Sequence, residues 1–237
     1  MSIVLCLFIG FTCLFSCART VTGTEDTLFI EFNITFNDTV DSSLYNYYLL
    51  FSKSNTSAIA PDTINIEEYF ISPALTYSTI GVDFNANANG SIQYYYETFF
   101  NTWSDYIIIQ DGASNLISSE SDAFLSTTTD NDNYIIDLYF EHSLEINDRT
   151  ITVTFDIEQL DLIADDTLYF RFLTAKRATE FGSNDQSGLL QDTISETKSI
   201  LLSNQQESSS TESIQSSEFG GAIDMAGDII SWEVSVF

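Results

Sequence analysis

Thr27 to Phe36 reads TLFIEFNITF, and this stretch alternates apolar and polar side chains. Every second residue from Leu28 to Phe36 is large and apolar, whereas the residues between them are polar except for Phe29. A period of two is typical of a β-strand that has one face in a core and the other in water. The stretch therefore predicts a half-buried strand.

The next apolar segment differs because it has no polar face. Leu44 to Ser52 reads LYNYYLLFS, which is apolar on both faces and is typical of a central strand. The polar turn Asn37 to Ser43 separates it from the first strand. We expect the two strands to form a hairpin.

The same period of two recurs along most of the chain, and no helical period is sustained over three turns. Clusters of Asn, Asp, Ser or Gly bound the further strands that we expect. These are Glu68 to Ile71, Ser91 to Phe100, Asp105 to Asp111, Tyr134 to Glu141, Thr150 to Asp156 and Thr167 to Thr174. The pattern predicts an all-β fold, an antiparallel two-sheet β-sandwich of the immunoglobulin-like or jelly-roll-like kind.

One segment near the end of the chain interrupts this pattern. Ser203 to Ser217 contains almost no apolar residue, so we expect a disordered Ser/Gln/Glu-rich insertion at about 182–221. Asp228 to Phe237 alternates again, which predicts a last strand with Ile230, Trp232, Val234 and Val236 on one face. Residues 27–237 are thus expected to form a single domain.

The N-terminal residues are typical of an export signal. Ile3 to Phe15 is an apolar run too short to span a bilayer and suited to a signal peptide. Leu14-Phe15-Ser16-Cys17 resembles the lipobox of bacterial lipoproteins, which implies cleavage before Cys17 and diacylation of its thiol. We therefore expect a lipoprotein signal peptide at 1–16, a tether at 17–26 and an extracytoplasmic protein anchored in the membrane of a bacterial cell envelope. An ordinary signal peptide and a secreted protein are the alternative.

Charge and cysteine content narrow the classes of partner. The 237 residues include 7 Lys and Arg against 35 Asp and Glu, a formal net charge of −28. This charge repels a phosphate backbone, so nucleic acid is not expected as a partner. Cleavage before Cys17 removes Cys6 and Cys13, which leaves one cysteine and no disulfide within the domain.

The order of these segments carries a family resemblance. Leu44 to Phe51, Leu168 to Arg177 (LYFRFLTAKR) and Asp224 to Gly227 (DMAG) before a final strand resemble a group of uncharacterised bacterial envelope lipoproteins. The resemblance implies a single β-sandwich, related in architecture to carbohydrate-binding modules and DOMON-type ligand-binding domains. It assigns no functional residue.

Few residues are candidates for chemistry. His142 is the only histidine, no G-x-S-x-G motif accompanies it, and we interpret it as a surface residue at the end of a strand. Asp130 and Asp132 alternate in DNDN, which makes them a candidate for a calcium site. The acidic turn Asp161 to Asp166 is similar. In so acidic a chain, solvated turns are the favoured interpretation of both, and no other cofactor is expected.

The sequence leaves two functions open. The favoured hypothesis is a non-catalytic module that binds an extracellular ligand such as a glycan, or that serves as a structural envelope component in contact with another envelope protein. The alternative is an exported carboxylate-dependent hydrolase of the glycosidase kind, with or without calcium. Tyr94 to Tyr96, Phe99, Phe100 and Trp103 could form a sugar-stacking platform, but core packing is the favoured interpretation of these aromatics.

Overall fold

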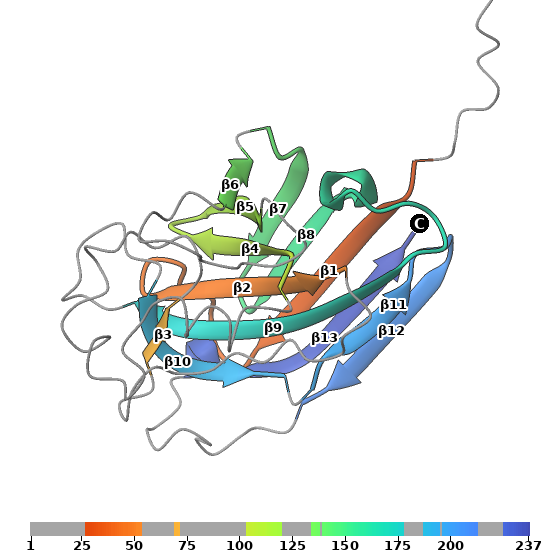
Figure 1. Ribbon diagram of the computed structural model, residues 1–237. Helices are drawn as coiled ribbons and strands as arrows, with labels where there is room; N and C mark the ends of the chain where they lie inside the picture. Colours follow the sequence, from red (N-terminus) through yellow and green to blue (C-terminus); the bar gives the residue numbers. More distant parts are fainter. Residues whose placement is uncertain are drawn as a thin grey trace, which may run out of the picture.

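The computed structural model describes residues 27–53, 69–71, 103–119, 134–137, 139–177, 187–194, 196–212 and 225–237. Two antiparallel sheets lie face to face, which confirms the predicted all-β sandwich (Figure 1). The five-stranded sheet runs in the order β12 (Gln206–Thr211), β13 (Ile229–Val236), β1 (Phe29–Phe36), β8 (Thr150–Asp156) and β7 (His142–Asn147).

The larger sheet has eight strands. Its order is β3 (Tyr69–Ile71), β10 (Ser187–Thr193), β9 (Thr167–Arg177), β2 (Tyr45–Ser52), β4 (Asp105–Gln110), β5 (Ala113–Ser119) and β6 (Tyr134–Asp137), and β11 (Lys198–Leu201) also pairs with β9. Two short 3₁₀ helices, η2 (Ile157–Leu160) and η3 (Met225–Gly227), lie between strands. Among the described residues, no helix has the length and apolar character needed to cross a bilayer.

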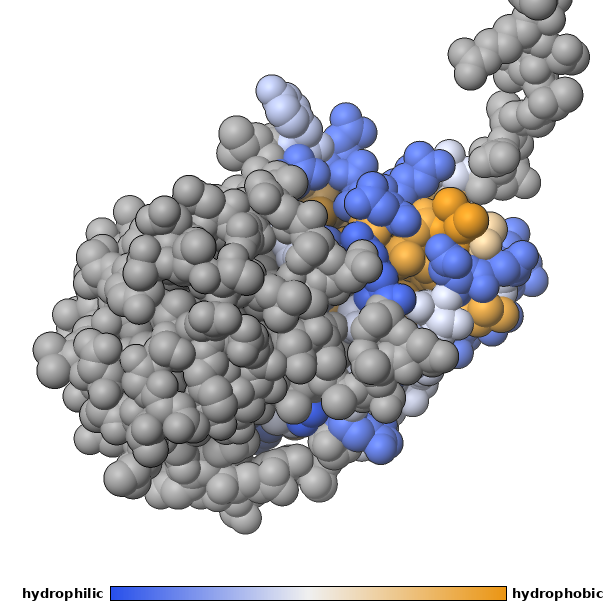
Figure 2. All heavy atoms as spheres, in the orientation of Figure 1, coloured by the Kyte–Doolittle hydropathy of each residue, from blue (hydrophilic) through white to orange (hydrophobic). Residues whose placement is uncertain are grey.

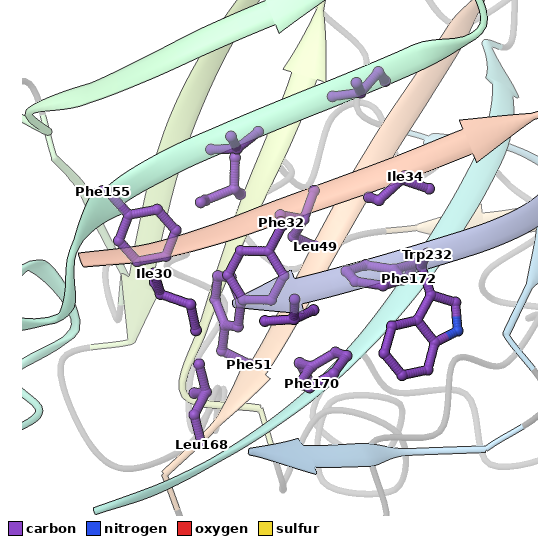
Figure 3. Packing of buried hydrophobic residues seen from close by; sticks show 14 of the residues in the cluster. Ile30, Phe32, Ile34, Leu49, Phe51, Phe155, Leu168, Phe170, Phe172 and Trp232 are labelled. Carbon is purple, nitrogen blue, oxygen red and sulfur yellow. The ribbon is translucent and has the colours of Figure 1, made fainter. Parts of the chain in front are cut away.

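β1 follows the alternation of its sequence. Ile30, Phe32, Ile34 and Phe36 are buried, whereas the residues between them are exposed or half-buried. Phe32 lies at the centre of the core between the sheets, and its ring contacts Phe51, Phe155, Phe170 and Phe172 at centroid distances of 5.5 to 5.9 Å (Figure 3). The predicted buried face of β1 is therefore confirmed.

The predicted hairpin between β1 and β2 is wrong. β1 pairs with β13 and β8, whereas β2 belongs to the other sheet, between β9 and β4. The chain between them changes sheets through a turn in which Asp41 Oδ1 accepts hydrogen bonds from the backbone N–H groups of Ser43 and Leu44. A strand that is apolar on both faces needs cover on both sides, and all eight residues of β2 are buried.

β13 lies inside the five-stranded sheet, between β12 and β1, but one of the four residues predicted to share a face is wrong. Trp232, Val234 and Val236 are buried, whereas Ile230 is half-buried and Ile229 takes the inner position opposite Phe36. The register shifts by one residue between Thr35 and Phe36. Such a bulge places an extra residue in one strand and moves the following side chains to the other face.

The expectation of disorder at about 182–221 is wrong for the residues described there. β10, β11 and β12 all fall within it, and β12 pairs along its whole length with β13. β12 is the edge of the five-stranded sheet, and its side chains are exposed or half-buried. An edge strand gains main-chain hydrogen bonds from one neighbour and needs few apolar side chains, so polar composition alone does not exclude it.

The remaining expected strands agree in position with differences at their ends. β3, β4, β8 and β9 fall at the expected places, whereas Tyr134 to Glu141 is divided into β6 and a turn before β7. β5 and β7 were not predicted. β5 forms a tight hairpin with β4, and β7 forms one with β8. The expected strand Ser91 to Phe100 lies outside the described residues.

Candidate ligand-binding groove

A groove with a volume of about 500 Å³ lies on the outer face of the five-stranded sheet, across β12, β13, β1 and β8. Its lining consists mostly of small polar side chains. The lining residues are Asn33, Thr35, Thr150, Ser209, Ser210, Thr211, Ser231, Trp232 and Glu233.

Strand register builds the floor of the groove. Thr35 of β1 is the partner of Ser231 in β13 and of Thr150 in β8, and Ser231 is also the partner of Thr211 in β12. Partners directly opposite in an antiparallel sheet project to the same face, so four hydroxyl groups lie in one row across four strands. In a second row, two residues along each strand, Ser209, Glu233 and Asn33 line the groove, whereas Thr152 of β8 continues the row beyond it.

The lining can both donate and accept hydrogen bonds. Hydroxyl groups do both, Asn33 has an amide, and Glu233 supplies a carboxylate. None of the nine lining residues is Lys or Arg. The branched threonines have few side-chain rotamers, so holding them in place around a ligand costs little entropy. The groove therefore suits a polar ligand that carries no net negative charge.

Aromatic stacking is not available from the groove. Trp232 is buried; its ring packs edge-on against Phe170 and Phe172, and its Nε1–H donates to Glu212 Oε1 at 2.9 Å. Trp103 is also fully buried and packs against Tyr106, which confirms the core interpretation for this residue. The other aromatics considered for a platform, Tyr94 to Phe100, lie outside the described residues.

The calcium candidates Asp130 and Asp132, like Cys17, lie outside the described residues. The acidic turn Asp161 to Asp166 is described, and the carboxylates of Asp161 and Asp166 have protein partners. Asp166 Oδ2 accepts from the backbone N–H of Ile163, and Asp161 Oδ2 lies 3.6 Å from Lys53 Nζ. Within the described ranges, no group of three or more His, Cys, Asp or Glu side chains is placed to hold a metal ion.

His142 is half-buried and lies at the start of β7, so its predicted place at the end of a strand is wrong. Its Nδ1–H donates to the Phe140 carbonyl at 2.9 Å, which leaves Nε2 to accept from Ser114 Oγ at 2.5 Å. Ser114 belongs to β5, so this hydrogen bond joins the two sheets. The third partner is a carbonyl and not a carboxylate, so the arrangement is not a Ser-His-Asp triad.

A buried carboxylate that the sequence analysis did not single out joins the sheets at another point. Asp192 of β10 accepts hydrogen bonds from the backbone N–H groups of Thr193 at 2.8 Å and of Ile229, in β13, at 2.7 Å. The pKa of Asp192 is raised to about 7, chiefly because burial disfavours the charged form. These two hydrogen bonds lower the pKa, and the nearby charges of Asp228 and Glu212 contribute to raising it. Since one of its oxygens accepts from the backbone of β13 and the other from the backbone of its own strand, we assign Asp192 to the fold and not to a ligand site.

No protein-family model, no curated protein and no solved structure matches this chain. The resemblance to envelope lipoproteins stays a prediction, and the candidate site rests on the geometry of the groove.

Proposed function

We propose that this protein is an exported, lipid-anchored β-sandwich of a bacterial cell envelope, and that it binds a glycan in the groove of the five-stranded sheet without catalysis. The observation that carries the proposal is the pair of polar rows across the strands, which form the floor of a groove of about 500 Å³. Ligand sites of small molecules have volumes of roughly 300 to 1,000 Å³, so the groove has room for a few sugar rings.

The chemistry of the lining selects among glycans. Sugars present hydroxyl groups that donate and accept, which are the complement of Ser, Thr and Asn side chains. Glu233 and the formal net charge of −28 repel uronic acids and sulfated or phosphorylated sugars. We therefore propose a neutral oligosaccharide that is held by hydrogen bonds.

Binding is favoured over the alternative of glycoside hydrolysis. Glycosidases generally use two carboxyl groups on opposite sides of the scissile bond, about 5 to 9 Å apart. Glu233 is the one carboxylate among the nine residues that line the groove. Release of reducing sugar from a bound oligosaccharide, abolished by Glu233→Gln, would support hydrolysis instead.

A glycan array probed with the purified protein tests the proposal. We expect signals from neutral oligosaccharides, and roughly a three- to tenfold loss of affinity in Thr35→Val and in Thr150→Val, because each loses one hydrogen bond at nearly constant shape. Thr152→Val is the matched control, since Thr152 lies on the same face of β8 but does not line the groove. Absence of neutral glycans from the array hits, or equal loss in all three variants, would contradict the proposal.

The envelope location rests on the apolar run Ile3 to Phe15 and on Cys17. The intact mass of the protein extracted from membranes tests it. We expect a chain that begins at Cys17 and carries diacylglycerol, and an unmodified N-terminus elsewhere would refute the anchor.

A further inference from the structure

Exposed large apolar side chains gather at one end of the sandwich, the end where β1 begins. Among the described residues, seven large hydrophobic side chains are exposed, and five of them belong to this end. Figure 2 shows orange, hydrophobic surface near the place where β1 begins and where the C-terminus lies. The five residues are Phe29, Tyr139, Ile163, Leu201 and Phe237.

Main-chain hydrogen bonds bring two pairs of these residues together. Phe29 and Phe237 exchange two backbone hydrogen bonds of 2.9 and 3.0 Å, and their rings stack at a centroid distance of 6.2 Å. Leu201 ends β11, and the next residue, Leu202, exchanges backbone hydrogen bonds with the turn that carries Ile163. We call Phe29, Ile163, Leu201 and Phe237 the apolar end patch; Tyr139 precedes β7, which starts at the same end.

The opposite end differs. The two other exposed large hydrophobics, Leu44 and Met225, lie there: the Leu44 carbonyl accepts from Arg177 at the end of β9, and the Met225 carbonyl accepts from Asp38 just after β1. Single exposed apolar residues are normal on a soluble surface, whereas a group that includes a stacked aromatic pair indicates an interaction site.

The position of Cys17 in the sequence indicates that the apolar end patch faces the membrane. The first described residue, Thr27, stands two positions before Phe29, and Cys17 stands ten positions before Thr27. Ten extended residues span at most about 36 Å, so an acyl anchor on Cys17 keeps this end near the bilayer. Phe side chains bury apolar area in the membrane interface, and Tyr is enriched at that depth.

We propose that the apolar end patch docks on the membrane surface and orients the sandwich. This proposal rests on the lipid anchor proposed above. β1 runs away from the patch, and Thr35 follows Phe29 by six residues, a rise of roughly 20 Å along a strand. Docking therefore holds the groove about 20 Å from the lipid surface, where a glycan can reach it.

Charge selects the lipid. The acidic turn Asp161 to Asp166 contains Ile163, and the whole chain has a formal net charge of −28. Anionic headgroups repel such a surface, with a range set by the ionic strength. We therefore expect docking on zwitterionic lipid and weaker docking on anionic lipid at low salt.

The test uses the full acylated protein in phosphatidylcholine vesicles that contain a photoactivatable lipid, followed by mapping of the labelled peptides. We expect labels in peptides that contain Phe29, Ile163, Leu201 or Phe237. In the double variant Phe29→Ser/Phe237→Ser, the labelling of these peptides should fall about tenfold. Labels spread evenly over the protein, or labelling unchanged in the double variant, would overturn the proposal.

The matched control is Leu44→Ser/Met225→Ser, which removes similar exposed apolar area at the opposite end and should leave the labelling pattern unchanged. Thermal melts of both double variants establish that the fold is intact. Intact mass reports separately on the anchor. If no acyl group is found, flotation of the protein with the same vesicles decides: binding that the Phe29/Phe237 variant loses supports the patch, and no binding refutes it.

Discussion

Asp192 should make the stability of this protein fall as pH rises. The pKa of Asp192 in the folded protein is about 7 and its ordinary value is 3.8, because burial disfavours the ionised carboxylate. Below about pH 4 the side chain is protonated in both states, so its contribution is fully present. Between about pH 4 and pH 7 only the unfolded chain loses the proton, so the free energy of unfolding decreases until the folded form ionises as well.

The size of the effect follows from the two pKa values. They differ by about three pH units, and each unit corresponds to about 1.4 kcal/mol, so the loss from Asp192 is at most about 4 kcal/mol. The groups that contribute to this pKa besides burial are the backbone donors of Thr193 and Ile229 and the charges of Asp228 and Glu212. A variant that lacks the Asp192 carboxyl isolates its contribution from that of the rest of the protein.

Urea denaturation of the wild type and of Asp192→Asn from pH 4 to pH 8 measures the effect. The amide stays neutral but has one acceptor for the two backbone donors, so we expect the variant to be less stable than the wild type at pH 4 by about 1 to 3 kcal/mol. This difference should shrink or reverse toward pH 8, because only the wild type loses stability through ionisation of Asp192. Asp161→Asn is the control, because Asp161 is almost fully exposed and Asn also tolerates its positive φ of 54°. Parallel pH profiles for the wild type and Asp192→Asn would refute the reasoning.

Three further predictions concern the packing of the sheets. Phe32→Ala should destabilise the protein by roughly 3 to 5 kcal/mol in urea denaturation, because Phe32 is fully buried among four aromatic rings. Phe29 is half-exposed, so Phe29→Ala should cost less than about 1.5 kcal/mol. Equal losses of stability in the two variants would contradict this. Ser114→Ala removes the hydrogen bond to His142 between the sheets and should cost about 1 kcal/mol, and no change in melting temperature would indicate that water replaces the hydroxyl. Truncation before β13 should abolish cooperative unfolding, because β13 lies between β12 and β1, and a cooperative melt of the shortened chain would show that the sheet closes without it.

Much of the fold could be predicted from local patterns. The alternation in Thr27 to Phe36 predicted the buried face of β1 residue by residue, and β2 and β8 appear at the expected places. These predictions succeed because successive side chains of a strand point to opposite faces, so residues that alternate in the sequence share one face. β12 was missed because its pairing depends on the main chain of β13, which side-chain composition does not report.

The candidate site was less predictable than the fold. The groove joins Asn33, Thr150, Ser209 and Glu233, which are ordinary Ser, Thr, Asn and Glu residues in four strands far apart in the sequence. No motif marks them, because each contributes one side chain to a row that exists only after the strands pair in register. The same holds for Asp192, whose raised pKa comes from burial against a strand that follows it by more than thirty residues.

The sequence by itself determined the β class, the half-buried first strand, the doubly buried second strand and the acidic charge of the surface. Those properties depend on near neighbours in the chain and on composition. Only the tertiary structure decided that β1 and β2 lie in different sheets, that Ile229 and not Ile230 faces the core, and that hydroxyl groups from four strands line one groove. Each of these depends on which strands pair and in what register, and hydrogen bonds between distant segments set both.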